Sequence, residues 1–262
     1  MLLKQLEIAL LSLTKDVVDK FSIAIHTDEG TISINSATPR KAASLAKLFI
    51  MAEAYQQVEK GSLSLEKLVY INSDKMVEGS GVIKYLTNSH VYSYQNLLEL
   101  MIIVSDNTAS NILLDAVGID RTNRFAKRIG CNHTFIKRKF MDDQAQLEGN
   151  ENATTAGDIV SLLKLFSREN DYFSMDSRGE ILEIFSNQQF NSKLSAFQQT
   201  SSRIKIYHKT GELHGVEHDA AIMIADGKIV EAAILTEGWD NNGDAQNYIT
   251  AIGKLLMAYL VD

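Results

Sequence analysis

The sequence has very little cysteine, proline or tryptophan, with one residue of each among its 262 residues. The single cysteine, Cys131, excludes an internal disulfide and any metal site built from several cysteines, and a lone cysteine is most often a small buried apolar residue. Pro39 is the only proline, and no internal repeat or low-complexity tract interrupts the chain. We therefore expect one domain without a flexible linker, and no metal or cofactor.

The chain also lacks a basic run. Its 33 acidic and 26 basic residues are spread along the sequence and give a formal net charge of −7. Nucleic-acid binding usually needs clustered lysine and arginine, with interleaved aromatic residues that follow a phosphate backbone. We expect no nucleic-acid partner.

No apolar run is long enough to cross a membrane. The leucine-rich residues 1–21 are interrupted by Lys4, Glu7, Lys15 and Asp16, and no small-residue cleavage site follows. This start therefore fails as a signal peptide and as a membrane span, and its apolar spacing favours an amphipathic helix. As written, the sequence predicts a cytoplasmic protein, although a chain trimmed of an export signal would look the same. The oligomeric state is open, with a monomer as the expectation.

The chain is rich in apolar residues, at 45%, and is long enough to bury a sizeable core. Short alternating runs predict strands, and apolar residues three or four apart predict helices. The expected strands are 21–27, 31–36, 204–210, 218–225 and 228–236, and the main expected helices are 43–60, 93–104, 107–117, 155–166, 177–186 and 242–260.

This order of elements predicts an α/β fold of 1–262 as a single domain. An antiparallel sheet flanked by terminal helices would form one lobe, from about 1–40 and 200–262. An all-helical lobe of about 41–199 would be inserted between its halves. The cleft between the lobes is the expected site.

A serine and a lysine stand three residues apart at Ser44 and Lys47, at the start of a predicted helix. Such a pair is weak evidence by itself, because five S-x-x-K sequences occur in this chain. The plain interpretation is a helix cap and a solvated charge. The catalytic alternative is that a desolvated Lys47, beside another cation, loses its proton and activates Ser44 without histidine.

Two further short motifs follow. Ser105-Asp106-Asn107 connects two predicted helices and could be an ordinary capped junction. Lys209-Thr210-Gly211 ends a predicted strand, where a cation, a hydroxyl and an unhindered backbone could receive an extended substrate, or where an edge strand simply enters a turn.

Together, in this order and 61 and 104 residues apart, the three motifs resemble the signature of class A β-lactamases and penicillin-binding proteins. The resemblance covers essentially the whole chain and implies the β-lactamase/transpeptidase fold. It also implies site roles. Ser44 would be the acylated nucleophile and Lys47 its base, and Ser105 and Lys209 would pass a proton to the leaving nitrogen. Asn107 would bind the substrate's side-chain amide, Thr210 and Lys209 its carboxylate, Gly211 would leave room at the strand edge, and the N–H groups of Ser44 and Glu212 would form the oxyanion hole.

The chain departs from the family in one loop. Class A enzymes carry R-x-E-x-x-L-N before a threonine pair, which here resembles Thr154-Thr155, and the glutamate activates the water that releases the acyl group. Arg138 stands at the arginine position, but Phe140 replaces the glutamate and Gln144 the asparagine. Phenylalanine cannot act as a general base. Four acidic residues nearby could take over or could form a solvated loop: Asp142 and Asp143, and less plausibly Glu148 and Glu151.

The sequence thus predicts a serine hydrolase acting on β-lactams or related amides and esters, with slow deacylation. The rivals are a D-alanyl peptide hydrolase or esterase and a non-catalytic sensor that holds its ligand at Ser44.

Three histidines near K-T-G fit a metal site poorly, because they fall on a strand and its following loop: His208, His214 and His218. Of these, His208 is expected to pack beside Lys209, and His218 to pair with Asp219. The turn at 79–81 lacks a phosphate-loop lysine.

Overall fold

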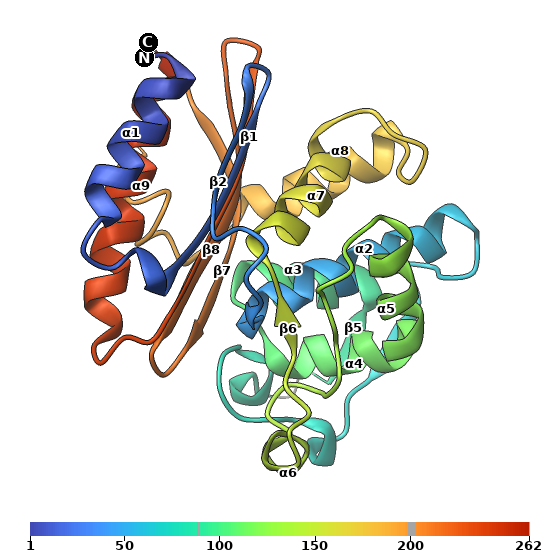
Figure 1. Cartoon of the computed structure of the whole chain (residues 1–262). Helices are drawn as coiled ribbons and strands as arrows, with labels where there is room; N and C mark the ends of the chain where they lie inside the picture. Colours follow the sequence, from blue (N-terminus) through green and yellow to red (C-terminus); the bar gives the residue numbers. More distant parts are fainter. Residues whose placement is uncertain (88–89, 199–202, 262) are drawn as a thin grey trace.

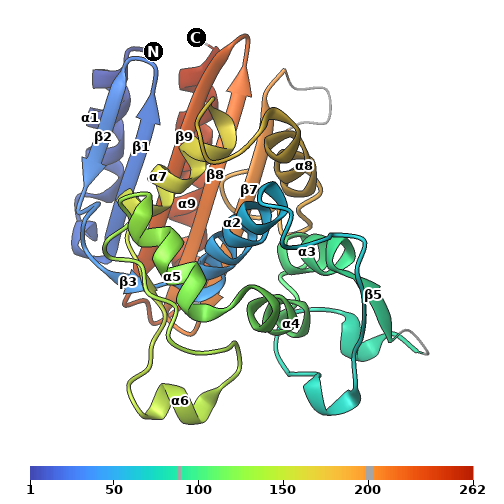
Figure 2. The same ribbon diagram turned by 90° about the vertical axis from the view of Figure 1, so that its right-hand side faces the viewer.

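The computed structural model describes residues 1–87, 90–198 and 203–261. Its centre is a five-stranded antiparallel sheet in the order β2-β1-β9-β8-β7 (Figures 1 and 2). The strands are β1 (Phe21–Thr27), β2 (Gly30–Ile34), β7 (Lys205–Leu213), β8 (Val216–Ala225) and β9 (Lys228–Glu237). The central strands β8 and β9 are buried on both faces, and this burial includes the polar run Glu217-His218-Asp219 of β8.

Two terminal helices, α1 (Leu3–Thr14) and α9 (Asn242–Val261), pack together on one face of the sheet, and the chain ends lie close to each other there (Figure 1). A separate apolar core fills the space between these helices and the strands. In the part of the chain that the structure describes, no helix is long and apolar enough to span a membrane.

The opposite face of the sheet is covered by the helical middle of the chain. The helices are α2 (Ala46–Glu59), α3 (Tyr94–Ile103), α4 (Asn107–Val117), α5 (Ile119–Arg128), α6 (Asp143–Leu147), α7 (Ala156–Ser167) and α8 (Met175–Ser186). Helix α2 is buried from Ala46 to Gln57 and is the central helix of this layer. A helix without a polar face has no stable place at the surface.

The short elements complete the frame. They are β3 (Arg40–Lys41) paired with β6 (Ala153–Thr154), β4 (Leu68–Tyr70) paired with β5 (Val91–Ser93), and the 3₁₀ turns η1 (Val18–Lys20), η2 (Ala43–Leu45), η3 (Ser73–Lys75) and η4 (Ile83–Tyr85). The β3–β6 pair fastens the loop before α7 to the chain just ahead of Ser44. That loop is thereby held close to the candidate nucleophile.

The predicted α/β class and the antiparallel sheet with an inserted helical layer are confirmed. The helix expected at 43–60 instead begins at Ala46, because Ala43 adopts a left-handed backbone (φ 46°) that an α-helix cannot contain. Helix α5 was not predicted. The single domain with lobe boundaries near 40 and 200 stays a prediction, and its second boundary falls on residues 199–202, outside the described part of the chain.

Candidate active site

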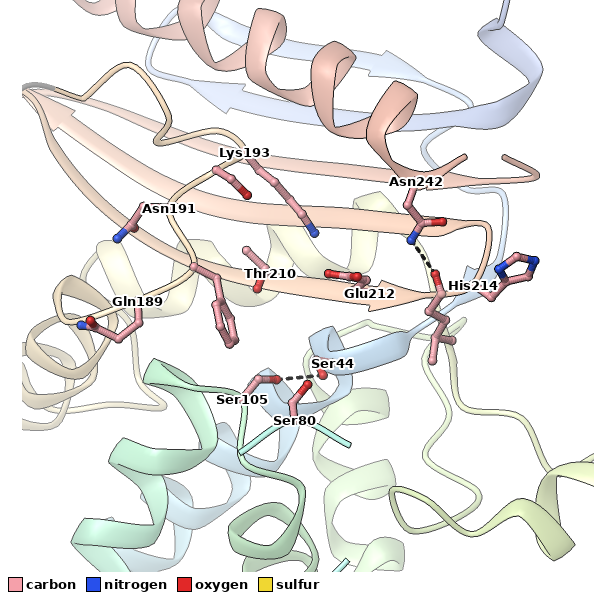
Figure 3. Close-up of a pocket in the computed structure, with 13 residues that line it drawn as sticks. Ser44, Ser80, Ser105, Gln189, Asn191, Lys193, Thr210, Glu212, His214 and Asn242 are labelled. Carbon is pink, nitrogen blue, oxygen red and sulfur yellow. Dashed lines mark hydrogen bonds between the residues drawn. The ribbon is translucent and has the colours of Figure 1, made fainter. Parts of the chain in front are cut away.

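Ser44 lies in the tight turn η2 at the foot of α2, facing strand β7 (Figure 3). The preceding residue, Ala43, has positive φ, and such strain in a residue other than glycine is concentrated at functional sites. Strand β7 passes close to this turn at Gly211, where an added Cβ would lie 3.4 Å from the Ala43 Cβ and 3.3 Å from the His218 side chain. The glycine of K-T-G is therefore a spacing residue that lets the strand edge reach Ser44.

The Ser105 hydroxyl is the centre of the polar network. It lies 2.9 Å from the Ser44 Oγ (Figure 3), and it accepts hydrogen bonds from the Nζ of Lys47 and of Lys209, each at 3.0 Å. All three sequence motifs therefore meet at one oxygen atom.

Lys47 makes its hydrogen bonds to the S-D-N motif. Its Nζ donates to the Ser105 carbonyl at 2.6 Å, the Ser105 Oγ at 3.0 Å and the Asn107 Oδ1 at 2.9 Å. Ser105 has a left-handed backbone (φ 54°), which lets its carbonyl and its hydroxyl both face Lys47. The sequence suggested a Ser44–Lys47 pair, whereas the structure places Ser105 between their polar atoms.

Both site lysines are completely buried. Burial, and then the charge of Lys209, hold the pKa of Lys47 well below its usual value. Burial, and then the charge of Lys193, lower the pKa of Lys209 to about 7. At neutral pH the cluster therefore holds a lysine that can accept a proton.

Asp106 ties the S-D-N motif to the loop that covers it. Its carboxylate caps α4 at Ala109 N (2.9 Å) and accepts from the N–H groups of Val82 (2.7 Å) and Ile83 (2.9 Å). The glycines of the loop allow this closeness. An added Cβ would lie 2.3 Å from the Asp106 Oδ2 at Gly81, and 2.6 Å from the Asn107 Nδ2 at Gly79. The turn at 79–81 thus lies at the rim of the site.

Replacing Asp106 by alanine is expected to lower the free energy of unfolding by about 3–5 kcal/mol, because three N–H groups lose their acceptor in a buried place. Urea unfolding would measure this, with Asp74→Ala on the exposed turn η3 as the control. The milder Asp106→Asn, which keeps one acceptor oxygen, covers the case in which the alanine variant does not fold. An Asp106→Ala protein that unfolds at the wild-type urea concentration would show that the loop is held by other contacts.

A large open cavity of about 840 Å³ extends from Ser44 along β7 (Figure 3). Thr210 and Glu212 line it from the strand, and Lys193 and Asn242 line it from segments that the sequence interpretation did not single out. Lys193 is buried and bonds the carbonyls of Gly211 and His218, each at 3.1 Å. It also pairs with buried Glu217. No local motif marks Lys193, because its partners come from strands that follow it in the sequence.

The loop that contains Phe140, where the sequence differs from the class A pattern, lies against Ser44 and Lys47. The Phe140 ring packs over Lys47, with the Nζ 4.6 Å from the ring centroid. Asn111 fixes this position through bonds to the Phe140 N–H (2.8 Å) and carbonyl (3.0 Å), and Arg138 pairs with Glu151 at 2.8 Å. Position 140 therefore faces the candidate base.

The two acidic residues suggested as alternative bases are placed differently. Asp142 caps the short helix α6 through Ala145 N at 3.0 Å, so its carboxylate is engaged. Asp143 lines a second cavity together with Ser44. Of the two less favoured residues, Glu151 is paired with Arg138, and Glu148 accepts a bond from Gln144 at 2.8 Å.

The histidines near K-T-G have structural contacts. His208, rather than His218, pairs with Asp219, at 3.0 Å. Burial lowers the pKa of His218 to about 4, and its Nε2 bonds the Lys41 carbonyl at 2.8 Å. His214 is exposed at the cavity rim. Among the residues that the structure describes, no group of acidic, histidine or cysteine side chains is arranged to hold a metal.

The sheet with its inserted helices has the fold of solved β-lactamases, and the serine–lysine site lies at the junction of its two layers. The family model described as the β-lactamase enzyme family matches residues 6–260, and the chain belongs to that family. The resemblance to class A β-lactamases expected from the motifs is confirmed.

A curated relative, β-lactamase BRO-1 of Moraxella catarrhalis, is 32% identical over 116 residues, which are 43% of this chain and 37% of the relative. The chain thus matches well under half of that protein's length. Among solved structures, a β-lactamase from Sphaerobacter thermophilus has a TM-score of 0.88 at 22% identity and covers 100% of this chain and 98% of its own. A mutant of PBP-A, solved as an acyl-enzyme complex with penicillin G, has a TM-score of 0.85 at 21% identity, with 98% and 96% covered.

Proposed function

We propose that this protein opens β-lactams, or related amides and esters, through an acyl-enzyme on Ser44. The observation that carries the proposal is the hydroxyl of Ser105, which touches Ser44 and two buried lysines at once. This arrangement supplies a nucleophile, a route for its proton and a base of depressed pKa without histidine.

In the proposed acylation, the Ser44 oxygen attacks the carbonyl carbon while its proton passes to Ser105, whose own proton moves to neutral Lys47. Because the Lys47 Nζ bonds Ser105, we assign Lys47 the role of base through that hydroxyl. When the carbon–nitrogen bond breaks, Ser105 protonates the leaving nitrogen, and Lys209 donates a proton to Ser105 in turn. The N–H groups of Ser44 and Glu212 would stabilise the oxyanion.

Substrate binding is assigned to the two sides of Ser44. Thr210 would bond a carboxylate on the side of the large cavity, with the charge of the buried Lys209 behind it, and Gly211 leaves room for the substrate along β7. Asn107, whose Oδ1 is occupied by Lys47 and whose Nδ2 bonds the Glu78 carbonyl at 3.1 Å, would offer its amide to the substrate's acyl group. A substrate amide would have to compete with one of these bonds.

Deacylation is proposed to be slow. The place facing Lys47 is filled by the Phe140 ring, which can neither accept a proton nor orient a water molecule. This favours a second candidate function, a penicillin-binding protein that is acylated and releases its ligand slowly, as a peptide hydrolase or a sensor would. Asp143 is the acidic side chain best placed to supply a partial substitute, because it lines a cavity shared with Ser44.

Intact mass measured against time after addition of a penicillin tests the proposal. A long-lived adduct of one penicillin mass is expected, since acylation has its groups in place and release does not. Rapid return to the free mass with hydrolysed penicillin accumulating would contradict slow deacylation and leave the hydrolase assignment intact. No adduct and no product, for lactams and for activated esters alike, would contradict the proposed function itself.

A further inference from the structure

A second cavity, of about 270 Å³, adjoins the large one at Ser44. Ser44, Ser80, Glu212 and Leu213 line both cavities. Suppose that the substrate's carboxylate lies toward Thr210 in the large cavity and that its carbonyl carbon lies at Ser44. The acyl substituent then extends from the carbonyl in the opposite direction. That substituent then enters the second cavity, so the lining of this cavity sets which acyl groups fit.

The charged lining of the second cavity is mainly acidic. It consists of Asp143, Glu151 and Glu212, with Arg138 as the cation. The Arg138 guanidinium is paired with Glu151 at 2.8 Å. Within the described residues, the carboxylates of Glu212 and Asp143 form no ion pair or side-chain hydrogen bond. The second cavity is therefore lined by two carboxylates that have no ion-pair partner among the described residues.

The site lysines lie behind the lining of the second cavity and do not contact a group bound there. Lys47 and Lys209 are completely buried and are not among the residues that line either cavity. Phe140 and Met141 add an apolar wall to the second cavity, beside the two carboxylates. An aromatic or aliphatic group that carries an ammonium would match both parts of this lining.

We propose that Glu212 and Asp143 make this protein prefer substrates whose acyl side chain is positively charged, and disfavour those whose side chain is anionic. The inference rests on the proposed function and adds to it a substrate class, amine-bearing acyl groups. Glu212 acts through its side chain, a role separate from that of its backbone N–H in the oxyanion hole.

Three penicillins that differ at one position of a phenylacetyl side chain test the preference, with an amino group, a hydrogen atom or a carboxylate there. The second-order rate of Ser44 acylation is measured at about pH 6.5, below the usual pKa of an α-amino group. The aminated compound is expected to react about tenfold faster than the neutral one, and the carboxylated one about tenfold slower, which is the scale of two solvent-exposed charges a few ångströms away. The differences should shrink at high salt.

The variants Glu212→Gln and Asp143→Asn, alone and combined, remove the charges and keep the shapes. The combined variant should lower the ratio of aminated to carboxylated rates by at least about tenfold, with both rates expressed relative to that of the neutral compound in the same variant. Glu66→Gln, on an exposed loop before β4, makes the same charge change away from the site and should leave the ratio unchanged.

Equal rates for the three compounds in the wild type, or a ratio that survives the combined variant, would overturn the inference while acylation of Ser44 still supports the proposed function. Failure of all three compounds to acylate the protein would overturn both.

Discussion

Replacing Ser44 by alanine is expected to abolish the penicillin adduct, with acylation reduced on the order of a thousandfold or more. The Ser44 Oγ is the only atom of this residue that can form the acyl bond, and Ser105, its hydrogen-bond partner at 2.9 Å, has its oxygen engaged with two lysines. The change removes one hydroxyl from a half-buried residue of a turn, so the fold should be retained. Intact mass and the mapping of the labelled peptide measure the result.

The chain offers its own control for this change. Ser161 begins another S-x-x-K sequence, but it lies exposed on α7, where its hydroxyl bonds the Gly157 carbonyl at 2.9 Å. Ser161→Ala should be labelled like the wild type. Labelling that persists in Ser44→Ala would remove Ser44 from its proposed role and direct attention to Ser105.

Replacing Phe140 by glutamate is expected to speed release of the acyl group on the order of a hundredfold, the usual contribution of a positioned general base. The side chain at position 140 already faces the reacting centre, since the ring lies 4.6 Å from the Lys47 Nζ. Its backbone is fixed at both ends of the residue by Asn111. The decay of a preformed adduct, followed by mass after removal of free penicillin, measures the release alone.

Phe140→Gln is the matched control, because it has the shape of glutamate and no basic oxygen. It should release the acyl group much more slowly than Phe140→Glu. The new carboxylate would also favour the charged form of Lys47. Acylation of Phe140→Glu is therefore expected to slow while deacylation quickens, and the two rates need separate measurement. Equal release by the two variants would mean that position 140 does not hold the deacylating water.

The sequence predicted the fold well because its signals are local. The hairpin at 21–36, the strands near 204–236 and the buried helix α2 follow from alternation and helical spacing. It missed α5, in which only three of ten residues, Thr122, Phe125 and Ala126, are buried and the rest of the helix reads as polar loop. Packing against α2 and α4 stabilises that helix, and packing is not visible in a local pattern.

The candidate site was predictable only where motifs exist. Ser44, Lys47, Ser105, Asn107 and Lys209 meet as expected, but the position of Ser105 between Ser44 and Lys47 depends on its left-handed backbone. Lys193 lowers the pKa of Lys209 through space and belongs to no motif. The pairing of His208, rather than His218, with Asp219 likewise follows from strand register, which places alternate residues on opposite faces of the sheet.

The Ser105 oxygen joins parts of the chain that are 61 and 104 residues apart, two of them in the helical layer and one in the sheet. A partly folded chain that lacks either the sheet or the helical layer has the nucleophile without its proton route. Covalent labelling by penicillin should therefore report completion of folding. During refolding from denaturant, labelling competence should appear with the last cooperative phase, later than the helical signal, so the drug becomes a conformational probe that needs no fluorescent tag.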